Sequence, residues 1–256
     1  PSFGVLPWFD TAYRLPAEGV MDLPARARSG GAGLIIAVPQ LPRIANFDDL
    51  DPLAAEPSVD LRIIPRGTPL PADAGLILLA GSKSTIADLE DLRREGWDID
   101  IAAHIRRGGH VAGLCGGYQM LGQTISDPGG VEGPAGSIAG LGHLALRDGT
   151  DLSSGTALRG YEIHMGQSTG ADCARPWLRL GDRDEGAISR SGRVRGCYLH
   201  GLFASDAFRA AYLAALGAPS TVMFEDQVEE TLDALAAHIE QYFDLDALLA
   251  AAAEIG

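Results

Sequence analysis

The chain has 256 residues, of which 46% are hydrophobic and 21% are charged, so it should fold as a globular protein rather than remain disordered. Its 20 basic and 34 acidic side chains give a formal net charge of −14, which argues against binding to nucleic acid or to anionic lipid. Its three cysteines form no C-x-x-C pair, which argues against a disulfide framework and a zinc ribbon. We therefore expect a cytoplasmic protein that binds neither nucleic acid nor membrane.

The first 30 residues are rich in Pro, Gly, Ala and Asp and show little periodicity, which is typical of a linker or docking arm. The sequence opens at Pro1 rather than Met, and residues 3–8 resemble the end of a strand. We expect a fragment of a longer chain, with an arm at residues 1–30 and a folded domain at residues 31–256.

Apolar runs of strand length alternate with helical patterns in the remainder of the chain. The predicted strands cover residues 34–38, 59–64, 75–80, 111–114 and 195–199. The predicted helices include one capped by Thr85, one over residues 97–107 and an amphipathic one over residues 228–243. Residues 127–151 read as a loop or short hairpin, with a possible strand at 141–146. The alternation predicts an α/β fold, a mostly parallel sheet with flanking helices and functional sites at the carboxyl ends of the strands.

The strongest local signal is Gly113-Leu114-Cys115-Gly116-Gly117, where an apolar strand runs into a helical pattern. This pattern predicts a nucleophile elbow with cysteine in place of serine, because a strand-to-helix turn this sharp leaves no room for a Cβ on its neighbours. The helix N-terminus favours a thiolate at Cys115, and the Gly116 amide is placed to hold an oxyanion. We expect Cys173 and Cys197 to be structural.

A cysteine nucleophile needs a base, and an imidazole is the usual partner. The six candidates are His104, His110, His143, His164, His200 and His238. His200 ends a strand-like run and precedes Gly201, so it should share the carboxyl edge of the sheet with Cys115. We predict His200 as the base and His164 as the alternative, which could instead line the substrate pocket.

A second glycine turn, Gly81-Ser82-Lys83-Ser84-Thr85, follows an apolar strand. It lacks the residue order of a phosphate loop, so we expect Gly81 to complete the oxyanion hole begun at Gly116. An acidic residue that orients the histidine is left unassigned, with Glu162 and Asp206 as possibilities.

At this point the sequence resembles the class I (triad) glutamine amidotransferases, which have a flavodoxin-like three-layer α/β fold. Within them it resembles the branch formed by the glutaminase domains of cobyric acid synthases. The stretches that carry the resemblance are residues 41–52, 80–89, 104–122, 160–166 and 198–203. The resemblance implies that Cys115 attacks the amide of glutamine, that His200 protonates the departing ammonia and that a thioester is then hydrolysed.

The resemblance also implies contacts with glutamine by Gln119, and we add Tyr118, Glu162 and His164 as substrate-binding candidates. Most class I members have a Glu two residues after the histidine, where this chain has Leu202, so a Cys-His dyad is expected. No cofactor is expected in this chain. A missing N-terminal synthetase domain would bind ATP and Mg²⁺ and use the ammonia to amidate corrin carboxylates of adenosylcobyrinic acid a,c-diamide in cobalamin biosynthesis.

Two other functions are compatible with these motifs. A standalone glutaminase subunit, such as one serving peptidoglycan stem-peptide amidation, would share the elbow but should lack the arm at residues 1–30. A non-catalytic interaction module would have no reactive thiol at Cys115.

Overall fold

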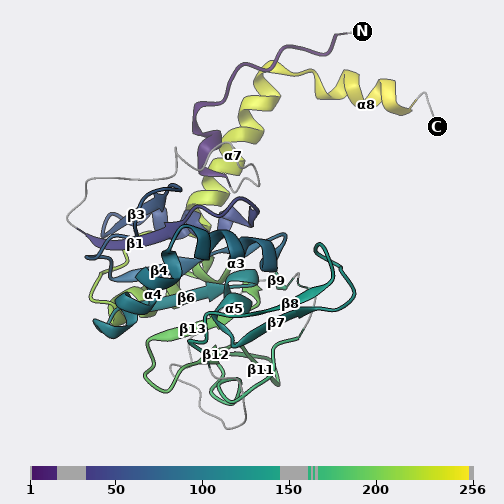
Figure 1. The fold of residues 1–256 in the computed structure, drawn as a ribbon. Coiled ribbons are helices and arrows are strands. Elements are labelled where there is room, and N and C mark those ends of the chain that lie inside the picture. The colour runs from purple at the N-terminus through teal and green to yellow at the C-terminus, as the bar shows by residue number, and fades with distance from the viewer. Residues whose placement is uncertain (1, 16–32, 145–160, 163, 165–166, 254–256) are drawn as a thin grey trace. The chain divides into compact units, whose positions relative to one another are not determined.

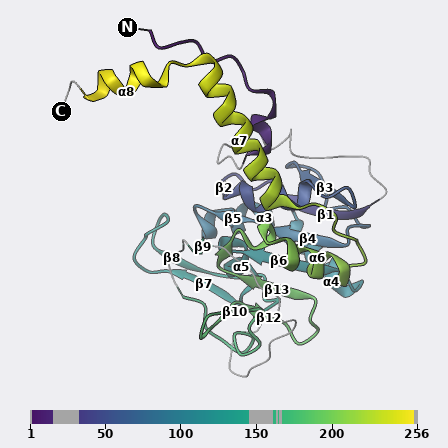
Figure 2. The same ribbon diagram turned by 180° about the vertical axis from the view of Figure 1, so that it is seen from behind.

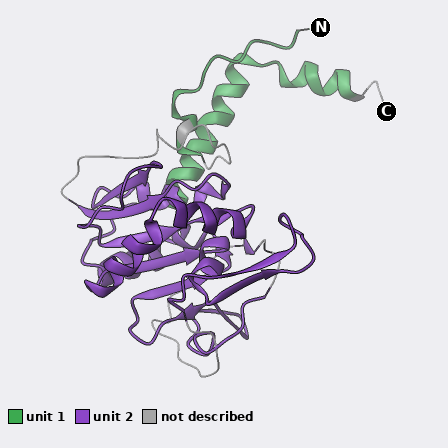
Figure 3. Cartoon of the chain, in the orientation of Figure 1, with its two compact units in different colours: residues 1–17, 223–256 green, residues 18–222 purple. Residues whose placement is uncertain are grey.

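The computed structural model describes residues 2–15, 33–144, 161–162, 164 and 167–253. Contacts within the chain divide it into two compact units (Figure 3). Unit 1 comprises residues 1–17 and 223–256, and unit 2 comprises residues 18–222. Each unit is described by itself.

A six-stranded sheet forms the centre of unit 2 (Figure 1). In spatial order its strands are β12 (Ala187–Ile188), β13 (Val194–Cys197), β6 (His110–Leu114), β4 (Leu76–Leu79), β1 (Leu34–Pro39) and β3 (Val59–Ile64). All neighbours pair in parallel except β12, which is antiparallel to β13. In chain order the five parallel strands take the spatial order 2-1-3-4-5, which is the flavodoxin-like arrangement. The predicted α/β fold class is confirmed.

Alternate side chains of the central strands enter two apolar cores, one on each face of the sheet. Ile36 and Leu78 belong to the first core, whereas Ala37 and Ile77 belong to the second. Residues of η3 (Phe47–Leu50), α2 (Asp51–Ala54), η4 (Leu202–Ala204) and α6 (Asp206–Ala215) complete the first core. Residues of α3 (Thr85–Arg94), α4 (Trp97–Arg106) and α5 (Gly116–Leu121) complete the second. Figures 1 and 2 show these helices on opposite faces of the sheet, giving three layers.

Short strand pairs hold the loops at the carboxyl edge of this sheet. β2 (Ile44–Ala45) pairs with β5 (Gly81–Ser82), and β9 (Tyr161–Glu162) pairs with β14 (Leu199–His200). A hairpin joins β7 (Thr124–Asp127) to β8 (Gly136–Ala139), and another joins β10 (Leu178–Leu180) to β11 (Arg183–Glu185). The sequence predicted a loop or short hairpin at residues 127–151; β8 lies within that range, whereas β7 precedes it except for Asp127.

Two local predictions were wrong. Thr85 is the first residue of α3 rather than its cap, because Ser84 precedes the helix and the Thr85 hydroxyl donates to Gln119 Oε1 at 3.0 Å. Residues 141–144 form no strand, since their amides bond to the end of α5 and the residues just after it; residues 145–146 lie outside the described part.

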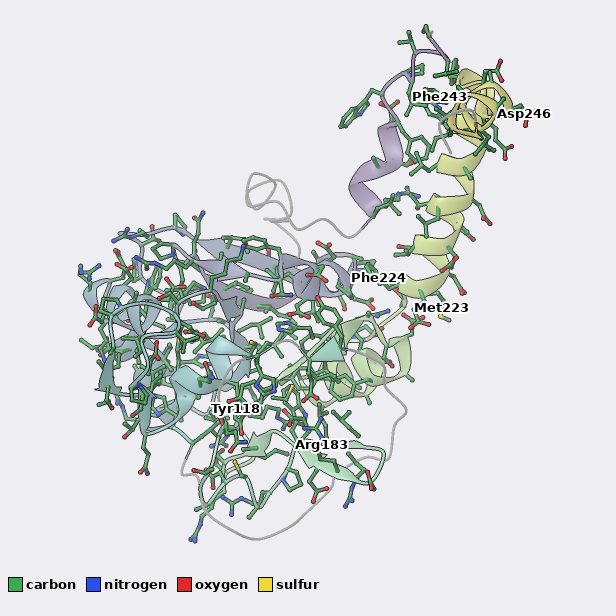
Figure 4. All side chains as sticks on the ribbon, turned by 90° about the vertical axis from the view of Figure 1, so that its right-hand side faces the viewer. Tyr118, Arg183, Met223, Phe224, Phe243 and Asp246 are labelled. Atoms are coloured by element: carbon green, nitrogen blue, oxygen red, sulfur yellow. The ribbon has the colours of Figure 1, made fainter. Side chains whose placement is uncertain are left out.

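Unit 1 consists of η1 (Asp10–Arg14), α7 (Phe224–Tyr242) and α8 (Leu245–Ala253). The helix predicted over residues 228–243 corresponds to α7, which ends at Tyr242; Phe243 is extended and forms a bridge with Gly4. The described part of the N-terminal arm follows α7: His238 Nε2 lies 3.0 Å from the Pro7 carbonyl oxygen, and the Phe3 and Phe243 rings are 6.5 Å apart (Figure 4). None of the helices in the described residues has the length and apolarity needed to span a membrane.

Candidate active site

The turn between β6 and α5 has the geometry of a nucleophile elbow. Cys115 sits between the two elements with φ of 50° and ψ of −111°, a conformation that residues with a Cβ rarely adopt. A Cβ on Gly117 would stand 2.1 Å from the Leu79 carbonyl oxygen, and one on Gly113 would stand 2.6 Å from the backbone of Gly117. Glycines flank the cysteine because the helix packs directly on the neighbouring strand.

His200 lies beside Cys115 at the carboxyl edge of the sheet. Its Nδ1 atom is 2.7 Å from Asp49 Oδ2, and the other carboxylate oxygen of Asp49 accepts the Gly201 N–H at 2.7 Å. Both side chains are almost completely buried. Nε2 is buried and makes no well-aligned hydrogen bond among the described residues, but it lies close enough to the Cys115 sulfur to be influenced by it. The three side chains therefore form a Cys-His-Asp arrangement.

The surroundings of His200 favour its protonated form. Burial alone would lower its pKa, but the hydrogen bond to Asp49, the charge of Asp49 and the nearby Cys115 sulfur outweigh burial and raise the pKa to about 10. Burial raises the pKa of Asp49, whereas the hydrogen bonds from His200 and Gly201 act in the opposite direction and stabilise its ionised form. The arrangement therefore supports an imidazolium held between Asp49 and the Cys115 sulfur at neutral pH.

Asp49 is the residue that sequence reasoning missed. It belongs to η3, 151 positions before His200, rather than to position 202, where Leu202 is buried in the core. Neither of the acidic candidates fills this role: Glu162 pairs with Arg183 on the surface, and Asp206 pairs with the buried Arg209. The available signal was that the segment after β1 had to lie near the carboxyl edge of the sheet, but this did not single out Asp49 among the polar residues of that segment.

The predicted oxyanion residues gather around the elbow. A Cβ on Gly116 would stand 2.9 Å from the Ser82 nitrogen, and one on Gly81 would stand 3.4 Å from His200 Cε1. The β2–β5 pair holds Gly81 and Ser82 opposite Ala45 and Ile44. The two predicted glycines therefore lie in loops that pack against each other and against His200, and their role as oxyanion donors stays a prediction.

The predicted substrate-binding residues occupy different environments. Gln119 lies one turn along α5 from Cys115 and bonds to Thr85 Oγ1 and, at 3.4 Å, to the Tyr198 hydroxyl. The His164 ring stacks on Tyr198 with centroids 3.7 Å apart. Tyr118 is only 2% exposed and lies inside unit 2 (Figure 4), with burial as the main cause of its raised pKa. Glu162 is engaged by Arg183, which leaves Gln119 and His164 as the candidates nearest the elbow helix and Tyr198.

The other two cysteines lie in surroundings that do not favour a thiolate. Cys197 is completely buried in the first core, and burial raises its pKa well above the usual range. Burial also raises the pKa of Cys173, which lies near the Tyr118 hydroxyl. Within the described residues, no three His, Cys, Asp or Glu side chains are placed to hold a metal ion.

A family profile and the sequences of similar proteins assign this chain to the same family. A profile described as a CobB/CobQ-like glutamine amidotransferase domain matches residues 35–208. The chain is 58% identical to a cobyric acid synthase of Ruegeria sp. (strain TM1040) over 97% of this chain and 54% of that protein. It is 53% identical to the cobyric acid synthase of Paracoccus denitrificans (strain Pd 1222), over 98% of this chain and 54% of that protein. Among solved structures, a chain from the structure of PurLQS from Thermotoga maritima aligns with a TM-score of 0.39 and 19% identity, covering 79% of this chain and 99% of that chain.

The profile match defines a glutamine-dependent amidotransferase domain, and the chain belongs to the CobB/CobQ-like glutamine amidotransferase family. Within that family it is similar to cobyric acid synthases, as the sequence motifs indicated, and it spans about half the length of the curated relatives it matches.

Proposed function

We propose that this chain hydrolyses glutamine through a thioester on Cys115 and supplies the ammonia for amidation of a corrin. The observation that carries the proposal is the contact of the elbow cysteine with His200, which Asp49 orients. A buried imidazolium beside a sulfur at a helix N-terminus is the arrangement that activates a thiol.

The proposed reaction begins when the Cys115 sulfur attacks the side-chain carbonyl carbon of glutamine. The carbonyl oxygen takes the negative charge and is held by amides near Gly116 and Gly81. His200 then gives its proton to the amide nitrogen, the C–N bond breaks and ammonia leaves, while Cys115 holds the γ-glutamyl group as a thioester. Water that loses its proton to His200 hydrolyses the thioester, which releases glutamate and restores the thiol.

The whole amidation reaction requires chemistry from a second part of the enzyme. We place ATP and Mg²⁺ in the half of the relatives that this chain does not span, where they would activate carboxylates of adenosylcobyrinic acid a,c-diamide. This assignment is supported by the names of the relatives and by the 54% of their length that is matched. Cytoplasmic location belongs to the same proposal.

Alkylation by iodoacetamide and glutamate release from glutamine test the glutaminase step. Cys115 should be alkylated faster than Cys173 and Cys197 at neutral pH, and Cys115→Ala and His200→Ala should each abolish glutamate release. His164→Ala serves as the comparison and should retain thioester formation. Equal, slow labelling of all three cysteines would show that Cys115 is not the nucleophile. Loss of the thioester only in His164→Ala would show that His164, rather than His200, is the base.

Addition of the other half of a relative tests the division of labour. This chain alone should hydrolyse glutamine weakly and consume no ATP, and the second half in trans with ATP, Mg²⁺ and the corrin diamide should raise glutamate production. ATP turnover by the 256-residue chain alone, without stimulation by the other half, would contradict the proposal.

A further inference from the structure

A cavity of about 380 Å³ lies beside the elbow helix. Gln119 forms part of its wall, the β7–β8 hairpin forms another part, and residues 167–169 contribute to the lining. The charged side chains among its described lining residues are Asp127 and Glu132, and no Lys, Arg or His is among them. A cavity beside the helix that follows the nucleophile, with only negative formal charges among its described lining residues, favours a cationic group in its occupant.

The two carboxylates are not equivalent. Asp127 is committed to the hairpin, since its two oxygens accept the N–H groups of Val131 and Glu132 at 2.9 Å each. Glu132 uses only Oε2, which accepts the Thr85 N–H at 2.8 Å, and Oε1 has no hydrogen bond to any described residue. Glu132 is therefore the carboxylate with an oxygen available to a ligand.

Thr85 connects Glu132 to the reaction centre. Its backbone N–H binds Glu132, its hydroxyl donates to Gln119, and that hydroxyl lies 3.2 Å from the position of a Cβ on Gly116. Glu132 is thus separated from the elbow by a single residue. The α-carbon of a glutamine whose amide lies at Cys115 is only three bonds from the amide carbon, and Gln119, one helical turn from Cys115, is already part of the cavity wall.

We propose that Glu132 binds the α-ammonium group of glutamine and makes the site selective for an α-amino acid. The proposal rests on the glutaminase function argued above and names the residue that recognises the α-amino end of glutamine, away from the reacting side-chain amide. Because no cation lines the cavity among the described residues, neutral donors such as the Ser168 and Thr169 hydroxyls are left to hold the α-carboxylate.

Glu132 could instead serve only to bind the first N–H of α3, and the experiment must separate these roles. Glu132→Gln keeps an oxygen that can accept from Thr85 and removes the negative charge. The matched ligand is 4-carbamoylbutanoate, which is glutamine with hydrogen in place of the α-ammonium group. A lost charge interaction weakens only the ligand that carries the ammonium, whereas a distorted α3 weakens both ligands.

Binding of the two ligands is measured by calorimetry in the full chain carrying Cys115→Ala, which prevents turnover. Adding Glu132→Gln should weaken glutamine binding by about 10- to 100-fold and change 4-carbamoylbutanoate binding less than about twofold. Glu90→Gln, on the exposed side of α3, is the control and should change neither. Glu132→Asp keeps the charge and should keep the preference for glutamine, so it decides the matter if Glu132→Gln does not fold.

Equal weakening of both ligands by Glu132→Gln, or no change in either, would overturn the proposal. So would Cys115→Ala protein that binds 4-carbamoylbutanoate as tightly as glutamine before Glu132 is altered. These outcomes are distinguishable from failure of the proposed function, because γ-glutamyl thioester formation by the unsubstituted chain reports on Cys115 and His200 independently of Glu132.

Discussion

The two ends of the central sheet place histidines in opposite electrostatic settings. At the carboxyl end, Asp49 and the Cys115 sulfur raise the pKa of His200 to about 10 despite its burial. At the amino end, burial lowers the pKa of His104 and His110, and the charges of nearby Arg side chains lower both further. The difference lies in the neighbouring charges, because Asp49 stabilises the imidazolium of His200, whereas Arg side chains destabilise the imidazolium of His104 and His110.

Cavity size does not separate the two ends. A cavity of about 390 Å³ at the amino end, lined partly by His104, Arg107 and His110, is as large as the one beside Gln119. Backbone strain does separate them. Cys115 and Asn46 are the non-glycine residues with positive φ in the described part of the chain, and both lie in segments at the carboxyl edge. At the amino edge the turn that leads into β6 uses Gly108.

Removing the charge of Asp49 should have the largest effect on this contrast. Asp49→Asn leaves His200 in place but removes the anion that stabilises its imidazolium and fixes its tautomer. Glutamate release should fall about 1,000-fold, with the loss mainly in kcat, as expected of a positioning residue that does not touch substrate. Asp48→Asn, whose carboxylate accepts from the Tyr161 hydroxyl instead, should lose less than about tenfold. Comparable losses in the two variants would show that Asp49 acts only through the local fold.

The same substitution should reveal the pH dependence of the His200–Asp49 pair. Because the pKa of His200 is raised in the folded state, protonation of His200 stabilises the fold. This stabilisation is complete below the pKa of an unfolded histidine, near 6.5, and is lost as pH rises through about 10. At pH 6.5 the free energy of unfolding of Asp49→Asn should therefore be about 3 kcal/mol lower than that of the parent, and this difference should be smaller at pH 10.5. Urea titrations at both pH values measure it. A difference that stays constant or grows with pH would mean that His200 is neutral in the folded chain.

Replacing the strained nucleophile should separate stability from activity. Cys115→Gly and Cys115→Ala both remove the thiol, but only glycine adopts φ of 50° and ψ of −111° without steric cost. We expect the glycine variant to have a free energy of unfolding about 1 kcal/mol higher than the alanine variant, with no glutamate release in either. If alanine is equally stable, the elbow does not hold Cys115 under strain.

The sequence was sufficient for features that depend on local pattern. The strands, their mostly parallel pairing and the elbow follow from short apolar runs and from glycines that steric crowding demands, whereas the flavodoxin-like order follows from the resemblance to class I glutamine amidotransferases. His200 is expected at the same edge as Cys115 because both follow strands. Asp49, Glu132 and the Thr85 contacts could not be found in this way. Each depends on a contact made across a folded distance, up to 151 positions for Asp49 and His200, and no local periodicity reports which of 34 acidic residues will be buried there.

The smallest expected effect is at the amino edge, where His110 begins the strand that leads to Cys115. Its pKa is lowered mainly by burial and then by Arg195, Arg193 and His104, so the unfolded chain binds more protons than the folded chain as pH falls below 6.5. The parent therefore loses stability on acidification, and His110→Gln removes this loss. Relative to the parent, the variant should gain about 0.5 kcal/mol between pH 7.5 and pH 5, a small value because solvent screens the half-exposed ring. Urea titrations give this difference, and glutamate release at pH 7.5 should remain within twofold of the parent. If the variant instead loses stability relative to the parent between pH 7.5 and pH 5, His110 is protonated in the folded chain. The contrast between the two ends of the sheet would then be wrong.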